Sequence, residues 1–406
     1  MRRLLGWGVL VAVMAASPAV ALEKPKDWVP PRYEQIPNFR EQARNVVEEL
    51  STYAKKRNPA FQVLMRGGGE LLVKGEVEIE WDEIHDPGGS NFIKRLPLRA
   101  AFRPLIKYLD GVVLDGIYCG PFKFDKPLDV VIKERRAWDA ESDREKKMGI
   151  HRPPTPVEVG PFSNDPAEEM RKAAEIKQKQ ERAELQRRKT YAIDAMRSEG
   201  RSVLTVESCE TKAEMEAAYR GAARDRVTAY VKQGNGPLDD APRVHPSREN
   251  PAEVLGVGTA RNLLPILRSD RFATKGKFIT ALENTNYDIV VVDVAHRGGD
   301  LIVKSDVQKL KYKNLGARRL VLAVMPIGRA FDWRWYWQKG WDVGNPPFLY
   351  AYDDDPGTFI TDIGSGDWKG VLAKYLTGII DLGFDGVMFD DVGTYLWFEE
   401  LMPLDK

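Results

Sequence analysis

Cysteine, histidine and net charge of one sign are scarce in this chain, and their scarcity excludes several classes of protein. The 406 residues include two cysteines and four histidines, and the formal net charge is +1. Two cysteines exclude a disulfide-rich scaffold, and a nearly neutral chain has no strong field to attract nucleic acid or anionic membranes. The histidines lack the spacing of a metal-ligand set; they are His85, His151, His245 and His296. A phosphate-binding glycine loop and a nucleophile-elbow motif are also missing. The sequence therefore predicts no metal, no cofactor and no nucleic-acid partner.

Long apolar runs are missing too, except at the N-terminus. There Arg2 and Arg3 precede an apolar stretch, Leu4–Ala16, and the small residues Ala19-Val20-Ala21 follow. This three-part pattern predicts a secretory signal peptide cleaved after Ala21, and hence a secreted or periplasmic protein. An uncleaved membrane anchor is the alternative. Because no other segment is apolar over eighteen residues, we expect no stable membrane span after cleavage.

Short apolar segments alternate with helical segments along most of the chain. Most of the apolar segments are continuously apolar rather than alternating, as is typical of parallel strands covered on both faces. Eight strands are expected, at Phe61–Met65, Val112–Ile117, Val203–Glu207, Val227–Val231, Asp288–Asp293, Leu320–Met325, Phe359–Ile363 and Gly386–Asp390. Helices are expected at Phe39–Arg57, Leu98–Leu109, Pro166–Met196, Lys212–Ala223, Lys275–Glu283, Val307–Leu315 and Trp368–Leu382. Eight strands alternating with helices predict an α/β fold, a closed (β/α)8 TIM barrel.

Two segments exceed the needs of a minimal barrel. One is Val73–Leu96, and the other combines a proline-rich stretch with a charged helix at Asp165–Arg188. We therefore divide the chain into a signal peptide at 1–21, barrel parts at 22–136 and 193–406, and a charged helical insertion at 137–192. The charged helix suits a solvated surface helix, and a partner-binding role is the alternative.

Three motifs in the C-terminal half resemble a known enzyme family. They are Tyr287–Asp293, Met325–Trp337 and Gly383–Asp390, the last reading Gly-Phe-Asp-Gly-Val-Met-Phe-Asp. Together they resemble the endo-α-1,4-polygalactosaminidase-like glycoside hydrolases, glycoside hydrolase family 114 and its relatives. The resemblance implies a (β/α)8 barrel that cleaves galactosamine-containing polysaccharide. It equates the three motifs with the first, second and fourth strands of the family.

The motifs occur in an unusual order. The sequence motifs that follow the fourth strand in the family appear near the start of this chain, at Tyr53–Val63 and Gly68–Leu72. The motif of the sixth strand appears at Leu109–Tyr118. The resemblance therefore implies a circular permutation in which strands five to eight come first and strands one to four second. Neighbouring chain ends in closed barrels permit such a change. Two unrelated α/β domains that share fragments are the alternative.

Acidic residues stand at the expected C-terminal ends of several strands, where barrel enzymes build their sites. Asp390 matches the catalytic Asp of the family's fourth strand, and Asp115 falls at the position of its sixth-strand Glu. Glycoside hydrolysis requires two such carboxyl groups, although a single strand-end acid also suits a helix cap or an ion pair. Ten Trp and fourteen Tyr suit sugar stacking as well as an ordinary core. The expected substrate-binding residues are Asp293, Arg329, Asp332, Trp335, Tyr336, Glu207, Asp391 and Tyr118.

Several positions depart from the family pattern. Asp115 is shorter than the family's Glu, Arg329 and Phe331 replace both glutamates of the second-strand motif, and Gly393 replaces the second Asp of the fourth-strand motif. Arg66-Gly67 stands where Gln-Asn is usual. Two functions therefore remain open. The first is a hydrolase acting on a polysaccharide, with amino-sugar polymers among the expected substrates, and the second is a barrel that binds glycans or envelope partners without cleaving them.

The two cysteines are expected to form a disulfide. Cys119 follows the expected sixth strand and Cys209 the seventh. Adjacent strands run about 4.8 Å apart, and a disulfide requires Cα atoms about 4.4–6.8 Å apart. Export supplies an oxidising compartment. Two separate buried thiols are the alternative.

Overall fold

The computed structural model describes residues 31–86, 96–120, 124, 126–148, 166–242 and 245–404. The predicted signal peptide, parts of Val73–Leu96 and parts of the predicted insertion lie outside these residues. Within the described part of the chain, no helix is long and apolar enough to cross a membrane.

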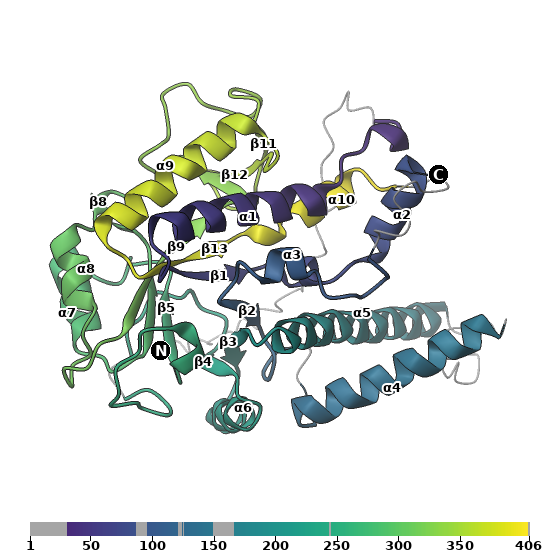
Figure 1. Cartoon of the computed structure of the whole chain (residues 1–406), viewed down its shortest axis with the longest axis horizontal. Coiled ribbons are helices and arrows are strands. Elements are labelled where there is room, and N and C mark those ends of the chain that lie inside the picture. The colour runs from purple at the N-terminus through teal and green to yellow at the C-terminus, as the bar shows by residue number, and fades with distance from the viewer. Residues whose placement is uncertain are drawn as a thin grey trace, which may run out of the picture.

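Eight parallel strands form the centre of the molecule (Figure 1). Their order around the sheet is β4-β3-β2-β1-β13-β9-β6-β5. Hydrogen-bonded pairing is parallel throughout this order, and an isolated parallel bridge between Ala229 and Asn262 brings the two outer strands together. The sheet is thus a nearly closed barrel of the TIM type. The strands are β1 Gln62–Arg66, β2 Gly111–Asp115, β3 Ser202–Cys209, β4 Thr228–Gln233, β5 Leu263–Ile266, β6 Ile289–Val292, β9 Leu320–Pro326 and β13 Gly386–Asp390.

Strand β1 lies parallel to β13, as the reordered motifs predict. Val63 pairs with Val387, and Met65 pairs with Phe389. The close approach explains Gly386, because a Cβ atom there would lie 2.2 Å from the carbonyl oxygen of Gln62. Segments more than 300 residues apart in sequence are therefore neighbours in the barrel.

One predicted barrel strand is wrong. The segment Phe359–Ile363 contributes to β12 (Thr358–Thr361), which lies in a separate antiparallel sheet between β10 (Arg329–Phe331) and β11 (Leu349–Tyr352). Its place in the barrel is taken by β5, Leu263–Ile266, which the sequence analysis missed. A further short pair is formed by β7 (Ala295–His296) and β8 (Asp300–Leu301).

Helices cover the outside of the barrel, with α1 and α9 side by side over β1, β13 and β9 (Figure 1). Asn38 caps α1 by accepting a hydrogen bond from the backbone N–H of Glu41, and Gly383, at φ 87°, ends α9 in a left-handed turn. The expected helix at Leu98–Leu109 shrinks to the single turn α3. The helices are α1 Phe39–Arg57, α2 Glu76–His85, α3 Arg103–Ile106, α4 Leu128–Lys147, α5 Pro166–Ser198, α6 Lys212–Arg224, α7 Lys275–Glu283, α8 Lys304–Leu310, α9 Gly366–Leu382 and α10 Tyr395–Leu401.

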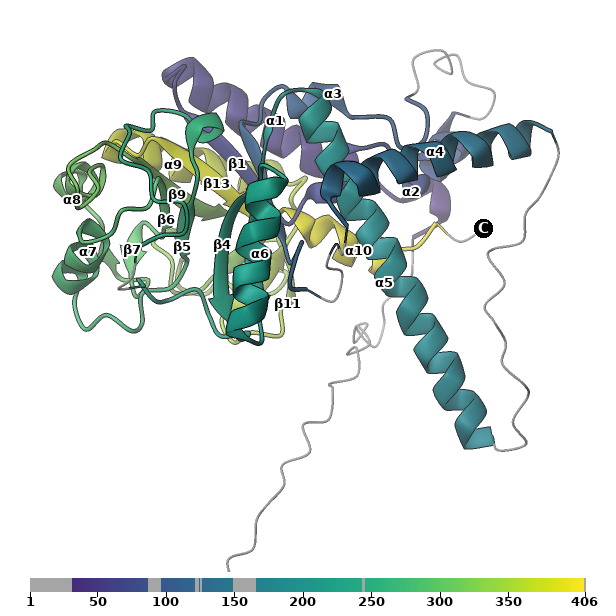
Figure 2. The same cartoon turned by 90° about the horizontal axis from the view of Figure 1, so that it is seen from below.

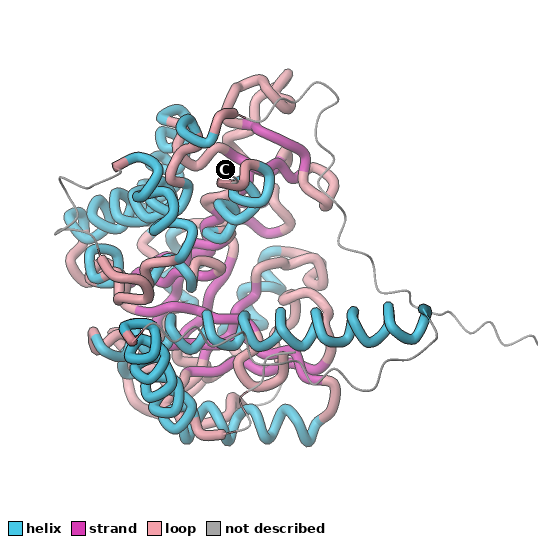
Figure 3. The backbone as a smooth tube through the Cα atoms, turned by 90° about the vertical axis from the view of Figure 1, so that its right-hand side faces the viewer, coloured by secondary structure: helices cyan, strands magenta, loops and turns pink. Residues whose placement is uncertain are grey.

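Helices α4 and α5 form an arm between β2 and β3. Both cross the predicted boundaries of the insertion, because α4 begins at Leu128 and α5 continues to Ser198. The last turns of α5 are buried against the barrel through residues such as Ile193 and Met196. Its first turns extend away from the body of the protein (Figures 2 and 3). One continuous helix therefore belongs to both the arm and the barrel wall.

Candidate active site

A pocket of 820 Å³ lies over the C-terminal ends of strands β1 to β5. Its volume falls within the range of small-molecule sites, and its position is where barrel enzymes place their chemistry. The lining residues come mostly from the loops that follow these strands. Those used below are Arg66, Asp115, Lys189, Glu210, Lys232 and Arg268, together with both cysteines.

Arg66, at the end of β1, joins the two acids that the sequence analysis proposes as catalytic. Its Nη1 atom donates to Asp390 Oδ2 at 3.0 Å, and its Nη2 atom donates to Asp115 Oδ1 at 3.2 Å. The two carboxylates come from β13 and β2, the strands on either side of β1. The structure therefore brings Asp390 and Asp115 to one place, with a guanidinium between them.

Asp115 and Asp390 differ in their surroundings. The Asp115 side chain is 51% exposed toward the pocket, whereas Asp390 is 13% exposed. Burial within the concave wall raises the pKa of Asp115 above its ordinary value; Arg66 opposes this rise and the charge of Asp390 adds to it. The carboxyl group that faces the pocket is thus one whose pKa is raised by its surroundings.

A second arginine organises the neighbouring acids. Arg329 Nη1 donates to Asp391 Oδ1 at 2.7 Å, and Arg329 Nε lies 2.6 Å from Asp353 Oδ2. Burial raises the pKa of Asp391 to about 6, with a further contribution from the adjacent charge of Asp390, while Arg329 opposes the rise. The backbone N–H of Asp391 donates to Asp390 Oδ1 at 3.0 Å. Two arginines and four carboxylates therefore form a continuous charged network across the strand ends.

Gly67 and Gly393 meet in space. A Cβ atom on Gly393 would lie 2.4 Å from the carbonyl oxygen of Gly67, and Gly67 has φ +81°. The backbone of the loop after β13 thus packs directly on the backbone after β1. A side chain at 393 would collide with this loop.

Asp293 follows β6 and forms an ion pair outside the pocket lining. Arg334 donates to both of its carboxylate oxygens, at 2.6 and 2.7 Å, and also to the hydroxyl of Tyr375. Arg334 is 8% exposed, which makes this a largely buried, bidentate ion pair, in which both Nη atoms of Arg334 are hydrogen-bonded. Asp293 therefore holds the segment after β9 in place through Arg334.

The aromatic residues expected to contact a sugar, Trp335 and Tyr336, are only partly exposed. Tyr336 is buried and packs edge-on against Trp335 and Trp368, and its hydroxyl accepts a hydrogen bond from the backbone N–H of Phe331. Trp335 is 48% exposed. Asp332 is exposed beside Gly357. None of these three residues lines the 820 Å³ pocket.

Glu207 does not face the pocket, contrary to its expected role in substrate binding. It is fully buried, and its carboxylate accepts hydrogen bonds from the backbone N–H groups of Ile117, Tyr118 and Cys119 at 2.7, 3.0 and 2.8 Å, and from the Thr205 hydroxyl. Burial raises its pKa, and these donors oppose the rise. Glu207 thus fixes the loop after β2.

Tyr118 points away from the pocket as well. Its hydroxyl donates to Asp225 Oδ2 at 3.0 Å at the end of α6, and a Cβ atom on Gly221 would lie 2.9 Å from its ring. Tyr118 is therefore a packing residue between the loop and α6.

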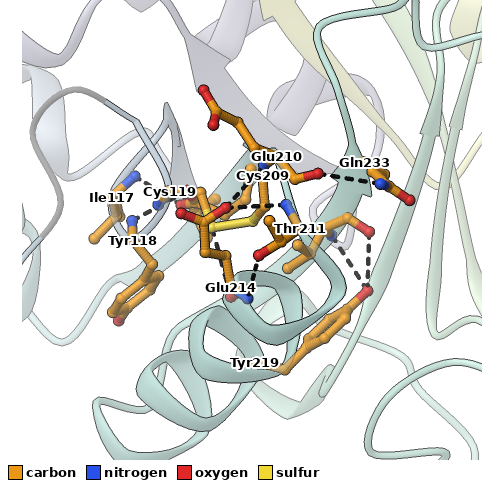
Figure 4. The surroundings of a disulfide bond; sticks show 12 residues. Ile117, Tyr118, Cys119, Cys209, Glu210, Thr211, Glu214, Tyr219 and Gln233 are labelled. Atoms are coloured by element: carbon orange, nitrogen blue, oxygen red, sulfur yellow. Dashed lines mark hydrogen bonds between the residues drawn. A yellow bond between two sulfur atoms is a disulfide. The ribbon is translucent and has the colours of Figure 1, made fainter.

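Cys119 and Cys209 form a disulfide in the wall of the pocket, with Cα atoms 5.0 Å apart. Figure 4 shows the bond beside the first turn of α6, where Thr211 and Glu214 form a capping box. The disulfide ties the loop after β2 to the end of β3. Together with Glu207 it makes this side of the pocket rigid.

Sequence reasoning missed the lysines of the pocket. Lys189, from α5, donates to the backbone carbonyls of Asp115 and Gly116, and Lys232, from β4, donates to the carbonyl of Gly236. Burial lowers the pKa of both ammonium groups. Lys232 directly follows the strand expected at Val227–Val231, which was an available signal, whereas Lys189 follows a charged helical segment with many similar residues.

Comparison with known proteins finds relatives without assigned activity. No family model matches the chain. An uncharacterized protein of Methanocaldococcus jannaschii is 30% identical over 125 residues, which are 30% of this chain and 35% of that protein. An uncharacterized protein of Deinococcus radiodurans is 31% identical over 118 residues, or 29% and 37% of the two chains, and one of Thermotoga maritima is 27% identical over 121 residues, or 29% and 37%. The matches span about a third of each relative's length.

Proposed function

We propose that this chain is a secreted or periplasmic glycoside hydrolase that acts on a polysaccharide through Asp390 and Asp115. One observation carries the proposal: two strand-end carboxylates are held on either side of a single guanidinium, and the guanidinium and one of the carboxylates, Asp115, line a pocket of 820 Å³, whereas Asp390 lies behind them outside its lining. Hydrolysis of a glycosidic bond requires two carboxyl groups across the reacting atoms. The pocket supplies the concave surface that such a substrate needs.

A circularly permuted barrel of the polygalactosaminidase-like family explains the strand order. If β13 is the fourth strand, then β1, β2, β3 and β4 continue the circle as the fifth to eighth strands, and β5, β6 and β9 precede it as the first to third. This count changes two assignments from the sequence. Asp293 follows the second strand rather than the first, and the Met325–Trp337 motif follows the third rather than the second.

The surroundings of the two acids suggest their roles. Asp115 faces the pocket and has a raised pKa, so it suits the proton donor to the leaving oxygen. Asp390 is held in place by Arg66 and by the backbone N–H of Asp391, so it suits the partner that acts as nucleophile or base. Arg66 occupies the space between them, and a bound sugar would have to displace it from the more exposed partner, Asp115.

A glycan-binding protein without catalysis is the second candidate. The observation that favours it is the double ion pair of Arg66, which neutralises both carboxylates. In that case the same pocket would bind polysaccharide and leave it intact.

Reducing-sugar release separates the two candidates. The mature protein, the variant Asp390→Asn and the control Asp367→Asn, on the exposed start of α9, are incubated with a panel of neutral, amino-sugar and uronic polysaccharides. We expect release by the wild type and the control, and a loss of at least about 10³-fold in Asp390→Asn because a reacting group is removed. Unchanged thermal unfolding would show that Asp390→Asn is folded. Binding without release by the wild type would establish the second candidate, and neither binding nor release would overturn both.

A further inference from the structure

We infer that Lys189 is a positioning residue for the candidate acid Asp115, and that it holds the end of β2 from the side of α5. The inference rests on the proposed function, because it assumes that Asp115 takes part in the reaction. It adds a residue of the charged helix to the machinery of the pocket and gives the base of the arm a role in it.

The Asp115 side chain needs a fixed backbone to keep its direction. It is 51% exposed and pairs with Arg66 at the pocket. An ion pair with an exposed carboxylate contributes little energy, so it leaves the geometry of that carboxylate loose. The direction of the carboxylate therefore depends on how firmly the backbone beneath it is held.

The backbone turns directly after Asp115. Gly116 has φ +65°, in the left-handed region that favours glycine. Strand β2 pairs with β3 as far as Asp115 and Val206, and the N–H of Gly116 donates to the Val206 carbonyl at 2.9 Å. Because the strand ends at this turn, backbone groups here take partners from other elements.

Lys189 supplies such a partner from α5. Its Nζ atom donates to the carbonyl oxygen of Asp115 and, at 3.0 Å, to that of Gly116. One ammonium group thus spans the two peptide units at which the chain turns. Hydrogen bonds from a charged donor are about twice as strong as those between neutral groups. The cation therefore fixes the turn more firmly than a neutral side chain would.

Glu207 holds the next part of the same loop from β3. Its carboxylate accepts hydrogen bonds from the backbone N–H groups of Ile117, Tyr118 and Cys119. The loop thus has carbonyl groups bound by a cation and N–H groups bound by an anion, which matches the polarity of the peptide. The two charges also act on each other, because burial lowers the pKa of Lys189 and the charge of Glu207 opposes that change.

The neighbouring residue on α5 fixes the position of Lys189. Arg188 Nη1 donates at 3.0 Å to Oε1 of Glu70, in the 3-10 helix η2 (Gly69–Leu72) that follows β1. About one turn further along α5, Ile193 is buried in the barrel wall. The helix is thus attached beside the ends of β1 and β2 at the level where it leaves the barrel. Lys189 reaches the pocket from this fixed base.

A titration without substrate tests the contact independently of hydrolysis. Carboxyl ¹³C NMR of the aspartate-labelled mature protein follows Asp115, whose signal is assigned by its loss in Asp115→Asn. Burial raises the pKa of Asp115, the charges of Arg66 and Lys189 oppose the rise, and that of Asp390 adds to it. We expect the Asp115 titration to move to higher pH in Lys189→Met. It should stay at the wild-type position in Lys189→Arg and in the control Lys179→Met, which is exposed on the same helix.

Steady-state kinetics on the same variants test positioning. The substrate is a galactosamine polymer, or the member of the polysaccharide panel that the wild type cleaves. Lys189→Met should lower kcat by about 10- to 100-fold and change KM by less than about twofold, because a displaced acid slows the reaction whereas Lys189 donates to the backbone rather than to substrate. Lys189→Arg should recover kcat to within about fivefold of wild type, and Lys179→Met should match wild type.

Thermal unfolding establishes that each variant is folded. Where Lys189→Met fails to fold, Lys189→Gln replaces it, since it keeps an N–H donor and lacks the charge. An unchanged Asp115 titration, an unchanged kcat, or an equal loss of kcat in Lys189→Arg would overturn the inference, and cleavage by the wild type would then leave the proposed function intact. A shifted titration in a protein that cleaves nothing in the panel would refute the proposed function while sustaining the hold of Lys189 on Asp115.

Discussion

Replacing Glu207 with Gln should destabilise the protein by about 2–4 kcal/mol although the two side chains have nearly the same shape. Glu207 Oε1 accepts from the backbone N–H of Ile117 and from Thr205, and Oε2 accepts from the N–H groups of Tyr118 and Cys119. A glutamine amide has one oxygen, so in its better orientation it keeps two of these backbone bonds and turns its NH₂ group toward the third donor. An unsatisfied buried N–H costs about 1–3 kcal/mol, and the two remaining bonds lose their charge assistance.

Urea denaturation of the mature protein measures this effect, with the free energy of unfolding compared among wild type, Glu207→Gln and Glu210→Gln. Glu210 is an exposed neighbour and its change removes the same charge, so the control should shift the free energy by less than about 0.5 kcal/mol. A Glu207→Gln value within about 0.5 kcal/mol of wild type would refute the reasoning. It would mean that the loop after β2 does not depend on the buried carboxylate.

Two further predictions concern the same rim of the barrel. Replacing both Cys119 and Cys209 with Ala should lower the unfolding free energy by about 4–5 kcal/mol in the chain-entropy model, because the bond closes a loop of 90 residues; a change below about 1 kcal/mol in urea denaturation would contradict it. The second prediction follows from the pKa of Asp391, about 6 in the folded protein against an ordinary value of 3.8. Between these values the folded state binds more protons than the unfolded state, so stability should fall as pH rises from about 4 to 6, by up to about 3 kcal/mol relative to Asp391→Asn. If the unfolding free energy of the wild type and of Asp391→Asn changed in parallel with pH, the predicted contribution of Asp391 would be refuted.

The barrel was largely predictable because its strands are buried on both faces. Segments such as Leu320–Met325 are continuously apolar, and the structure buries every residue of β9. The same logic failed at Phe359–Ile363, since all four residues of β12 are buried as well but the strand belongs to an antiparallel sheet. Apolar periodicity cannot distinguish these two settings. It also missed β5, whose four residues include Pro265, a residue that normally argues against a strand.

The candidate site was predictable only in part. Strand-end position correctly indicated that Asp390 and Asp115 approach one another, but it could not show that Arg66 joins them. Glu207 stands at the end of a predicted strand as well, yet β3 continues to Cys209 and the Glu207 side chain turns inward to backbone N–H groups. Strand register fixes where a side chain starts, whereas its direction depends on loops whose conformation the sequence pattern does not encode.

Within the part of the chain that the structure describes, the barrel closes through a single bridge between Ala229 and Asn262, while every other neighbouring pair of its strands is joined by a hydrogen-bonded ladder. The joint between β4 and β5 is therefore a seam. Lys232 lies on one side of this seam, and Leu267 and Arg268 lie on the other, so the pocket straddles it. Widening the pocket along the seam breaks fewer hydrogen bonds than separating any other two neighbouring strands. The opposite wall is held by the disulfide and by the hydrogen bonds of Glu207. The width of the pocket available to a ligand is therefore set at the seam.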